Sequence, residues 1–282
     1  MGHYERSAYR GPIRGVILDW AGTVVDYGSF APTAVFLRLF ENHGVKITAE
    51  DARSGMGLMK KDHLRTILAR PSVCESWKIA HDGASPTEMD VDLLFESFIP
   101  MQLAVVQDYA GLIPGLLETM KELRRREIKI GSTTGYIRKM MDVLAPRARE
   151  LGYEPDCIVC PDDVPAGRPA PFMCYLNAAR LGVFPLESMV KVGDTQVDIE
   201  EGLNAGMWTV GLSLTGNLVG KTQAEVDSLS ATQRNTLRKK AEDVLLGSGA
   251  HMVIDGIWDL NKALGLVTAA LVRGRHPRDG NL

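Results

Sequence analysis

The sequence has no long apolar run, no strong excess of either charge and only four cysteines. No stretch reaches the about 20 consecutive apolar residues that cross a bilayer, and the first residues lack the apolar core of a secretory signal. We therefore expect a cytoplasmic protein without a membrane partner. The net charge of −3 gives no reason to expect nucleic acid as a partner. In a reducing compartment the four cysteines are expected to be free thiols.

The rest of the composition is that of a folded globular protein. Hydrophobic residues make up 45% of the 282 residues and charged residues 24%. A chain of this length is long for one compact core. It fits one large domain with a smaller domain attached.

Residues 15–26 give the first sign of chemistry. They read Gly-Val-Ile-Leu-Asp-Trp-Ala-Gly-Thr-Val-Val-Asp, and the short, β-branched apolar run at 16–18 predicts a buried strand. The strand ends at Asp19, a carboxylate whose burial is costly unless something compensates it. The turn at Gly22 and Thr23 lets the backbone curl round a small anion or metal. Because ligands of open α/β sheets bind beyond the carboxyl ends of the strands, Asp19 is the first candidate for catalysis.

The region after this strand predicts helices and no strand. Pro32 is placed to open a first helix, and Thr48 begins a capping box for a second. A third helical pattern continues to Arg70. Ser85 is interpreted as the N-cap of a fourth helix, which Pro100 should kink or end. The pattern indicates an all-helical insert that follows the first strand.

Helices and strands alternate over the remainder of the chain, which predicts a parallel sheet. The fold class is therefore α/β, with a Rossmann-like parallel-sheet core and an inserted all-helical cap domain. The expected core domain comprises residues 1–28 and 107–282, and the cap residues 29–106. The later strands are expected at 128–131, 157–160, 190–193 and 208–212.

Polar side chains follow four of the expected strands, and parallel strands place such ends at one edge of the sheet. Carboxylates gathered at that edge would repel one another unless a cation lay between them. Asp19 and Asp194, with a backbone carbonyl, offer the hard oxygen ligands that suit Mg²⁺. The residues at these ends are Asp19, Ser132 to Thr134, Asp162 with Asp163, and Asp194 with Asp198.

These segments resemble the four motifs of the haloacid dehalogenase superfamily. Its first motif usually reads D-x-D-G-T, and this chain has Asp19-Trp-Ala21-Gly-Thr. Ser132-Thr-Thr-Gly matches the second motif, and Gly193-Asp-Thr-x-x-Asp198 matches the fourth. The cation of the third motif is best supplied by Arg168, whose planar fork suits a dianionic phosphonyl group.

The resemblance implies a role for each of these residues. Asp19 would be the nucleophile and would bind Mg²⁺ together with Asp194 and the backbone of Ala21, while Asp198 would support the site. Thr134 would hold the phosphoryl group through its hydroxyl. The substrate-binding residues that the resemblance implies are Ala21, Met56, Thr134, Gly135, Tyr136 and Arg168.

Two departures make the chain similar to the phosphonatases, the phosphonoacetaldehyde hydrolases of this superfamily. The second aspartate of the first motif is replaced by Ala21, as in the D-W-A-G-T form of that family. The segment Met56-Gly-Leu-Met-Lys60, with His63 three residues on, matches the stretch that carries their Schiff-base lysine. Lys60 and His63 lie one helical turn apart, so the two would share a face and His63 could relay protons. Lys61 points elsewhere and serves as a control.

Ala21 and Lys60 explain each other chemically. A phosphate ester benefits from an acid that protonates its leaving oxygen, whereas a P–C bond has no such oxygen and needs an electron sink on carbon. A protonated imine on Lys60 would be that sink. The resemblance implies cleavage of phosphonoacetaldehyde to acetaldehyde and phosphate in 2-aminoethylphosphonate degradation, by a homodimer joined through its caps. Two alternatives stay open: a phosphatase or phosphotransferase acting on another small phosphate, and a silent binding protein of the same fold.

Three further features give no indication of a catalytic role. Cys157 and Cys160 resemble a redox or zinc half-site but lie on an apolar strand, which favours buried thiols. Residues 1–12 are polar and expected to be loosely held. The charged, glycine-rich tail from Arg273 is expected to be disordered.

Overall fold

The structure is a computed structural model that describes residues 9–282; part of the expected loose segment at residues 1–12 lies outside them. Its centre is a six-stranded, wholly parallel sheet with strand order β3-β2-β1-β4-β5-β6, which confirms the predicted α/β class. The strands are β1 Gly15–Leu18, β2 Lys129–Thr133, β3 Cys157–Val159, β4 Met189–Gly193, β5 Trp208–Leu212 and β6 Met252–Ile254.

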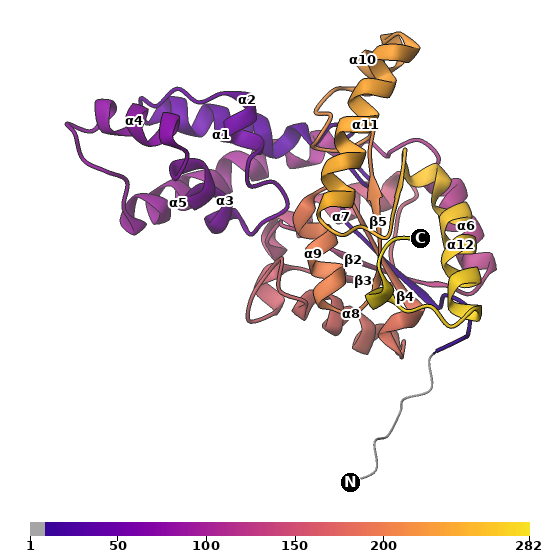
Figure 1. The fold of residues 1–282 in the computed structure, drawn as a ribbon. Coiled ribbons are helices and arrows are strands. Elements are labelled where there is room, and N and C mark those ends of the chain that lie inside the picture. Colours follow the sequence, from indigo (N-terminus) through magenta and orange to yellow (C-terminus); the bar gives the residue numbers. More distant parts are fainter. Residues whose placement is uncertain (1–8) are drawn as a thin grey trace.

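Helices cover both faces of this sheet (Figure 1). The β1 side chains alternate between the faces: Val16 and Leu18 join the main core, and Ile17 joins a second cluster with Cys174 and Met207. Helices α8, α9 and α11 pack on the face of Ile17, and α6, α7 and α12 on the other. These helices are α6 Leu116–Arg125, α7 Arg138–Glu150, α8 Phe172–Leu181, α9 Gln196–Asn204, α11 Ala231–Gly247 and α12 Leu260–Val272; the short helix α10 Gln223–Ser228 precedes α11.

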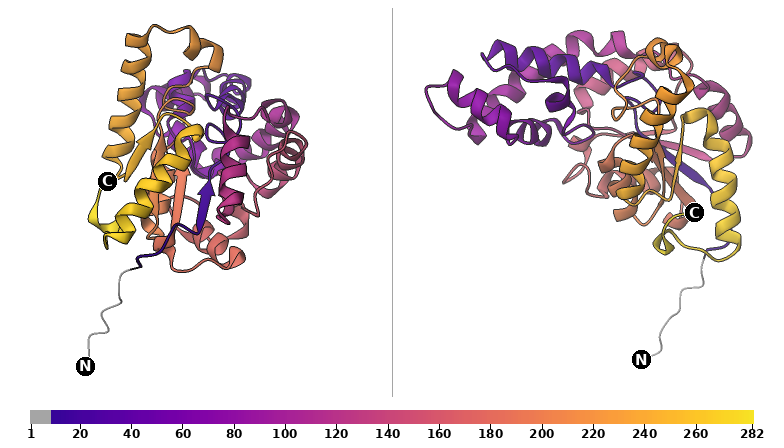
Figure 2. Two further views of the ribbon diagram at one scale, coloured as in Figure 1. Left: turned by 90° about the vertical axis from the view of Figure 1, so that its right-hand side faces the viewer. Right: turned by 45° about the horizontal axis from the view of Figure 1, so that its top comes forward.

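Between β1 and β2 the chain forms six α-helices, and the first five of them lie together beside the sheet (Figures 1 and 2). These five are α1 Phe30–Asn42, α2 Ala49–Arg53, α3 Lys60–Leu68, α4 Pro71–Ala80 and α5 Glu88–Val105. We call residues Phe30–Val105 the helical group. Its interior joins Phe36, Leu64 and Phe98, which are fully buried. The group follows the carboxyl end of β1, so it lies next to Asp19. Its assignment as a separate domain, residues 29–106, stays a prediction.

The structure confirms one local prediction in the helical group and differs from the predictions for α5. The capping box at Thr48 is confirmed. The N-cap of α5 is Thr87 rather than Ser85, because the Thr87 hydroxyl accepts from the Asp90 amide while Asp90 accepts from Thr87. Helix α5 does not end at Pro100 but runs on to Val105. One proline removes only one helical hydrogen bond, and the packing of α5 against α1 and α3 maintains the helix.

Pro71 begins a helix that the sequence reading missed. It occupies the first turn of α4, where its missing N–H has no helical partner to lose. The buried side chains of α4, Val73 and Trp77, attach it to the core. Among residues 9–282, no helix combines the length and apolar character needed to cross a membrane.

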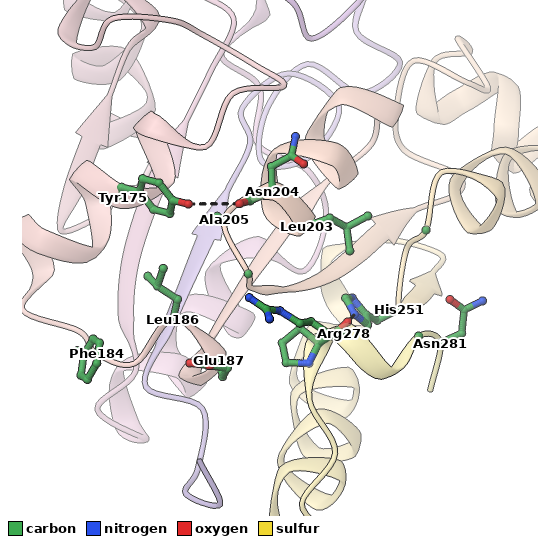
Figure 3. Close-up of a pocket in the computed structure, with 14 residues that line it drawn as sticks. Tyr175, Phe184, Leu186, Glu187, Leu203, Asn204, Ala205, His251, Arg278 and Asn281 are labelled. Atoms are coloured by element: carbon green, nitrogen blue, oxygen red, sulfur yellow. Dashed lines mark hydrogen bonds between the residues drawn. The ribbon is translucent and has the colours of Figure 1, made fainter. Parts of the chain in front are cut away.

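The C-terminal segment is ordered, contrary to the expectation of disorder. Pro277 is buried, its carbonyl lies 2.5 Å from His251 Nε2, and the Leu282 amide donates to the His251 carbonyl. A hollow of about 660 Å³ lies here, lined by this tail and by the segments that precede β4, β5 and β6 (Figure 3). It is at the amino end of the strands, opposite Asp19, and its lining includes a single carboxylate, Glu187.

Candidate active site

The predicted polar side chains meet at the carboxyl edge of the sheet. β1 lies between β2 and β4, so Asp19, Thr134 and Asp194, which follow these three strands, are neighbours. All three are buried. The fourth predicted strand end does not join them: Asp162 and Asp163, which follow β3, bond to Arg138 and do not line the cavity that contains Asp19.

Arg168 lies at the centre of these groups. Its guanidinium is 2.7 Å from the Asp19 carboxylate, 2.9 Å from Asp198 and 2.9 Å from Glu201, and its Nη2 also donates to Thr133 Oγ1. The side chain is almost fully buried although it comes from the loop between β3 and α8. A buried cation with several acidic partners is held in one orientation, so Arg168 is a fixed donor beside the nucleophile candidate.

Two members of this charge network were missed from the sequence. Lys191 lies in the middle of β4, and its Nζ is 2.6 Å from Asp198 and 3.5 Å from Glu201 of α9. Lys191, Asp198 and Glu201 are all fully buried. Burial alone would raise the pKa of Asp198, but Arg168 and Lys191 hold it below its usual value. A lysine inside an apolar strand, with acids seven and ten residues on, is the sequence signal that could have indicated the network.

Asp194 is positioned as a metal ligand would be. Its Oδ2 accepts the Asn217 amide at 2.6 Å, while its Oδ1 is buried and has no hydrogen-bond partner among the described residues. Carboxylate oxygens of Asp19, Asp194 and Asp198 come within 4.8 Å of one another. Asp198 is already engaged by Lys191 and Thr195, so Asp19 and Asp194 are the two carboxylates best able to bind a cation.

The raised pKa values of Asp19 and Asp194 also indicate that a nearby cation would stabilise their ionised forms. Burial, followed by the Asp198 carboxylate, raises the pKa of Asp19 to about 6, against the opposing effect of Arg168. Burial, followed by Asp19, raises the pKa of Asp194 well above its ordinary value. A divalent cation between Asp19 and Asp194 would reverse both shifts, because it favours the ionised carboxylates. The donor set therefore fits a metal ion with oxygen ligands.

The loop after β2 lines the opposite side of the site. Thr134 Oγ1 accepts the Tyr136 amide at 3.0 Å, which fixes the turn. A Cβ at Gly135 would lie 2.6 Å from the Leu58 carbonyl oxygen, so only glycine lets the helical group approach this closely. Burial raises the pKa of Tyr136 well above its usual value, which keeps its phenol protonated.

Lys60 reaches the site from the helical group. It begins α3, it is 3% exposed, and its Nζ lies 5.0 Å from the centre of the Tyr136 ring and 5.8 Å from that of Phe36. Burial, with a smaller contribution from the Arg168 charge, lowers the pKa of Lys60 to about 7, although Asp19 acts in the opposite direction. A lysine in this state supplies a neutral amine near neutral pH.

The neighbours of Lys60 differ sharply from it. Lys61 is half-buried, with its side chain 40% exposed, and its Nζ pairs with Asp92 at 2.6 Å. His63 is fully buried, its Nε2 lies 2.8 Å from the Ala52 carbonyl, and its Nδ1 has no partner among the described residues. Burial and the Lys60 charge hold the pKa of His63 well below its usual value, so the ring is neutral. Its proton-relay role stays a prediction.

One small cavity joins these side chains. Its volume is about 20 Å³, enough for about one water molecule. Asp19, Ala21, Thr134, Arg168 and Asp194 line it from the sheet, and Met56 and Lys60 from the helical group; Gly135 and Tyr136 complete the predicted residues in its wall. His63 and Asp198 are not among its lining residues. The structure therefore shows a closed arrangement in which the helical group covers Asp19.

Residues 13–206 match the model of a protein family described as haloacid dehalogenase-like hydrolase. This segment makes up more than half of the chain and contains Asp19, Lys60, Arg168 and Asp194. The chain belongs to this hydrolase family.

Two relatives and one solved structure are more specific than the family model. A protein of Syntrophobacter fumaroxidans named phosphonoacetaldehyde hydrolase is 47% identical over 269 residues, which are 95% of this chain and 97% of that protein. One of the same name from Bacillus cereus is 48% identical over 255 residues, 89% of this chain and 95% of that one. A crystal structure described as a phosphonoacetaldehyde hydrolase-like protein from Oleispira antarctica has a TM-score of 0.94 and 39% identity, covering 98% of this chain and 100% of its own.

Proposed function

We propose that this hydrolase cleaves the P–C bond of phosphonoacetaldehyde and releases acetaldehyde and phosphate. The observation that carries the proposal is that a nucleophile candidate, Asp19, and a neutral-amine candidate, Lys60, line one closed cavity. The wall of that cavity has Ala21 where an ester phosphatase would place an acid. The names of the close relatives support the same substrate.

The fixed orientation of Arg168 suggests how the substrate would bind. The phosphonyl oxygens would lie against Arg168, whose guanidinium is already oriented by Asp198 and Glu201. The Thr134 hydroxyl and the amides of its loop would complete the contacts. This places phosphorus beside Asp19 and directs the aldehyde toward the helical group.

Lys60 would make the carbon a leaving group. Its neutral amine condenses with the aldehyde and releases water, and protonation of the imine creates an electron sink. Asp19 then attacks phosphorus, and the electrons of the P–C bond pass into the imine to give an enamine. Water hydrolyses the aspartyl phosphate, while protonation and hydrolysis of the enamine return acetaldehyde and free Lys60.

A divalent metal, proposed to be Mg²⁺, would be held by Asp19, Asp194 and the backbone carbonyl of Ala21. When bound it would neutralise the carboxylates and the phosphonyl oxygens. The unpaired oxygen of Asp194 and the raised pKa values of both acids support such a site. Asp198 would support the site by fixing Arg168 and Lys191.

The cavity is too small for the substrate, so binding requires the helical group to move away from the sheet and return. Closure then excludes water and brings Lys60 to the aldehyde. His63, whose ring centre lies 4.2 Å from that of Phe36, is proposed to accept a proton at Nδ1 during imine formation.

The test is a phosphate-release assay with phosphonoacetaldehyde beside common phosphate esters, each with and without Mg²⁺. The proposal expects turnover of phosphonoacetaldehyde that requires the metal, and little turnover of the esters. Preference for an ester would favour the alternative of a phosphatase or phosphotransferase. Metal binding without any turnover would favour a silent binding protein.

The wider setting is proposed from the resemblance. The enzyme would act in the cytoplasm, where its four free cysteines suit a reducing environment, and in 2-aminoethylphosphonate degradation. We propose a homodimer joined through the helical group, where Ile79, Met89 and Leu93 are exposed. Light scattering on the protein, compared with a variant carrying Ile79→Lys and Met89→Lys, tests this: the variant should be monomeric.

A further inference from the structure

A second cleft lies beside the closed cavity, between the helical group and the segments that follow β4 and β5. Its volume is about 560 Å³, and it shares Met56 and Thr195 with the cavity. Arg53 and Arg70 line it from the helical group, and Asn217 and Lys240 from the other side. The contacts that bridge this cleft decide how firmly the helical group is held closed.

Arg53 makes bridging contacts across this cleft. It is the last residue of α2, and its Nη1 donates to the Gly28 carbonyl at 2.8 Å and to Asn217 Oδ1 at 3.0 Å. The Asn217 Nδ2 donates back to the Arg53 carbonyl at 3.5 Å. Because both of these acceptors lie outside the helical group, moving α2 away from the sheet breaks these bonds.

The partner of Arg53 also touches the metal-ligand candidate. The Asn217 backbone amide donates to Asp194 Oδ2 at 2.6 Å. The carboxylate has little freedom, since a Cβ at Gly216 would lie 2.1 Å from Asp194 Cβ, and one at Gly22 would lie 2.5 Å from Asp194 Oδ2. A displacement of Asn217 therefore changes the position of Asp194.

The loop at Gly220 leaves room for the Arg53 guanidinium. Gly220 has φ +60°, and a Cβ there would lie 2.9 Å from Arg53 Cζ. Gly28 has φ +91° and its amide donates to the Thr215 carbonyl at 2.8 Å, so the segment that enters α1 is tied to the same loop. Helix α2, the segment before α1, and loop 215–220 thus meet at Arg53.

We infer that Arg53 is a positioning residue that couples closure of the helical group to the placement of Asp194 through Asn217. This deepens the proposed function, because closure is what brings Lys60 over Asp19. With Arg53 bonded to Asn217, the closed helical group and the correctly placed carboxylate stabilise each other. Without this bond each can form alone, and the fraction of enzyme with both in place is smaller.

The competing explanation is electrostatic attraction of the anionic substrate by positive side chains in the cleft. Lys240 is the matched control, because it is exposed and lines the same cleft. Arg70 is a second control, since its partners Glu50 and Asp51 lie in the helical group with it and do not bridge the cleft. Attraction by charge would be weakened by Lys240→Ala, whereas coupling would not.

The first experiment needs no substrate. Hydrogen exchange of the metal-free protein should become about 10-fold faster at residues 54–60 and 216–220 in Arg53→Ala, because a hydrogen bond to a charged group is lost. Calorimetry should show weaker Mg²⁺ binding in the same variant, with Arg53→Lys closer to wild type because one nitrogen makes the bonds. Lys240→Ala should match wild type in both measurements. Unchanged exchange and Mg²⁺ affinity in Arg53→Ala would overturn the inference whatever the substrate proves to be.

The second experiment is a double-mutant cycle of Arg53→Ala and Asn217→Ala on kcat for phosphonoacetaldehyde. Coupling predicts that each change lowers kcat about 10-fold and that the double variant is no worse than about 10-fold. Additive losses, or a loss in Lys240→Ala as large as in Arg53→Ala, would overturn it. If wild type fails to turn over phosphonoacetaldehyde, the proposed substrate is wrong, and the exchange and calorimetry results still decide the coupling.

Discussion

The guanidinium of Arg168 lies 2.7 Å from the Asp19 carboxylate, and both side chains are buried beneath the helical group. The loop between β3 and α8 supplies the cation and the end of β1 supplies the anion, so their pairing depends on the whole sheet. The contact orients Asp19 toward the cavity that it shares with Lys60. The proposed chemistry depends on this geometry.

Replacing Asp19 with asparagine separates nucleophilicity from folding. The amide has nearly the same shape but cannot attack phosphorus, so phosphate release should fall at least about 1,000-fold. Burial raises the pKa of Asp19 to about 6, so its ionised form at pH 7 opposes folding, and the metal-free variant should melt no lower than wild type. Phosphate release and thermal melting measure the two effects. Substantial activity in Asp19→Asn would assign the nucleophile elsewhere.

The Arg168→Lys variant tests whether activity requires the oriented, planar guanidinium of Arg168. An ammonium cannot reach Asp19, Asp198 and Glu201 together as the guanidinium does. We expect kcat/KM to fall about 100-fold, the size typical for loss of an oriented donor. Steady-state kinetics provide the measurement, and wild-type kinetics would move the phosphonyl-binding role to another residue.

Lys191→Met tests the buried network that supports Arg168. The change leaves Asp198 and Glu201 with one fewer cation in a dry environment, which should destabilise the fold by about 3–5 kcal/mol. Urea unfolding measures this. The matched control is Lys239→Met: this lysine pairs with Asp243 on the exposed face of α11, so its urea midpoint should change little. Equal losses in the free energy of unfolding for the two variants would show that the buried network stabilises the fold no more than an exposed ion pair does.

The pH dependence should report Lys60. Its pKa is lowered to about 7, so the amine is mainly protonated below pH 7 and mainly neutral above it. Only the neutral amine attacks the aldehyde, so kcat/KM should rise with pH through about 7 and then level off. A pH–rate profile with constant ionic strength checks this. A rise centred near the pKa of a free lysine would show that the buried environment does not tune Lys60.

The sequence predicted the fold and most of the cavity because these depend on local patterns. Short apolar runs ending in Asp19, Thr134 and Asp194 mark parallel strands, and parallel strands have one functional edge. The motif resemblance implied Met56 and Lys60, and both line the same cavity. The motif resemblance added Arg168, which nothing in a proline-rich loop would otherwise distinguish from an exposed arginine.

The sequence could not supply contacts between distant segments. Glu201 was missed because an acid in a helix is usually exposed, and only the packing of α9 on β4 buries it. The order of the C-terminal tail depends on His251 and Pro277, which are far from each other in the sequence. Likewise the contact of Arg53 with Asn217 spans segments that only the closed helical group brings together.

The most direct test of the account is to trap the imine. Borohydride added with phosphonoacetaldehyde should inactivate the enzyme and leave a reduced adduct that peptide mass spectrometry locates on Lys60. Lys60→Arg should form no adduct and show almost no turnover, whereas Lys61→Arg, altered at the lysine that pairs with Asp92, should be labelled on Lys60 and behave nearly as wild type. A label on another lysine, or efficient P–C cleavage by Lys60→Arg, would contradict the account.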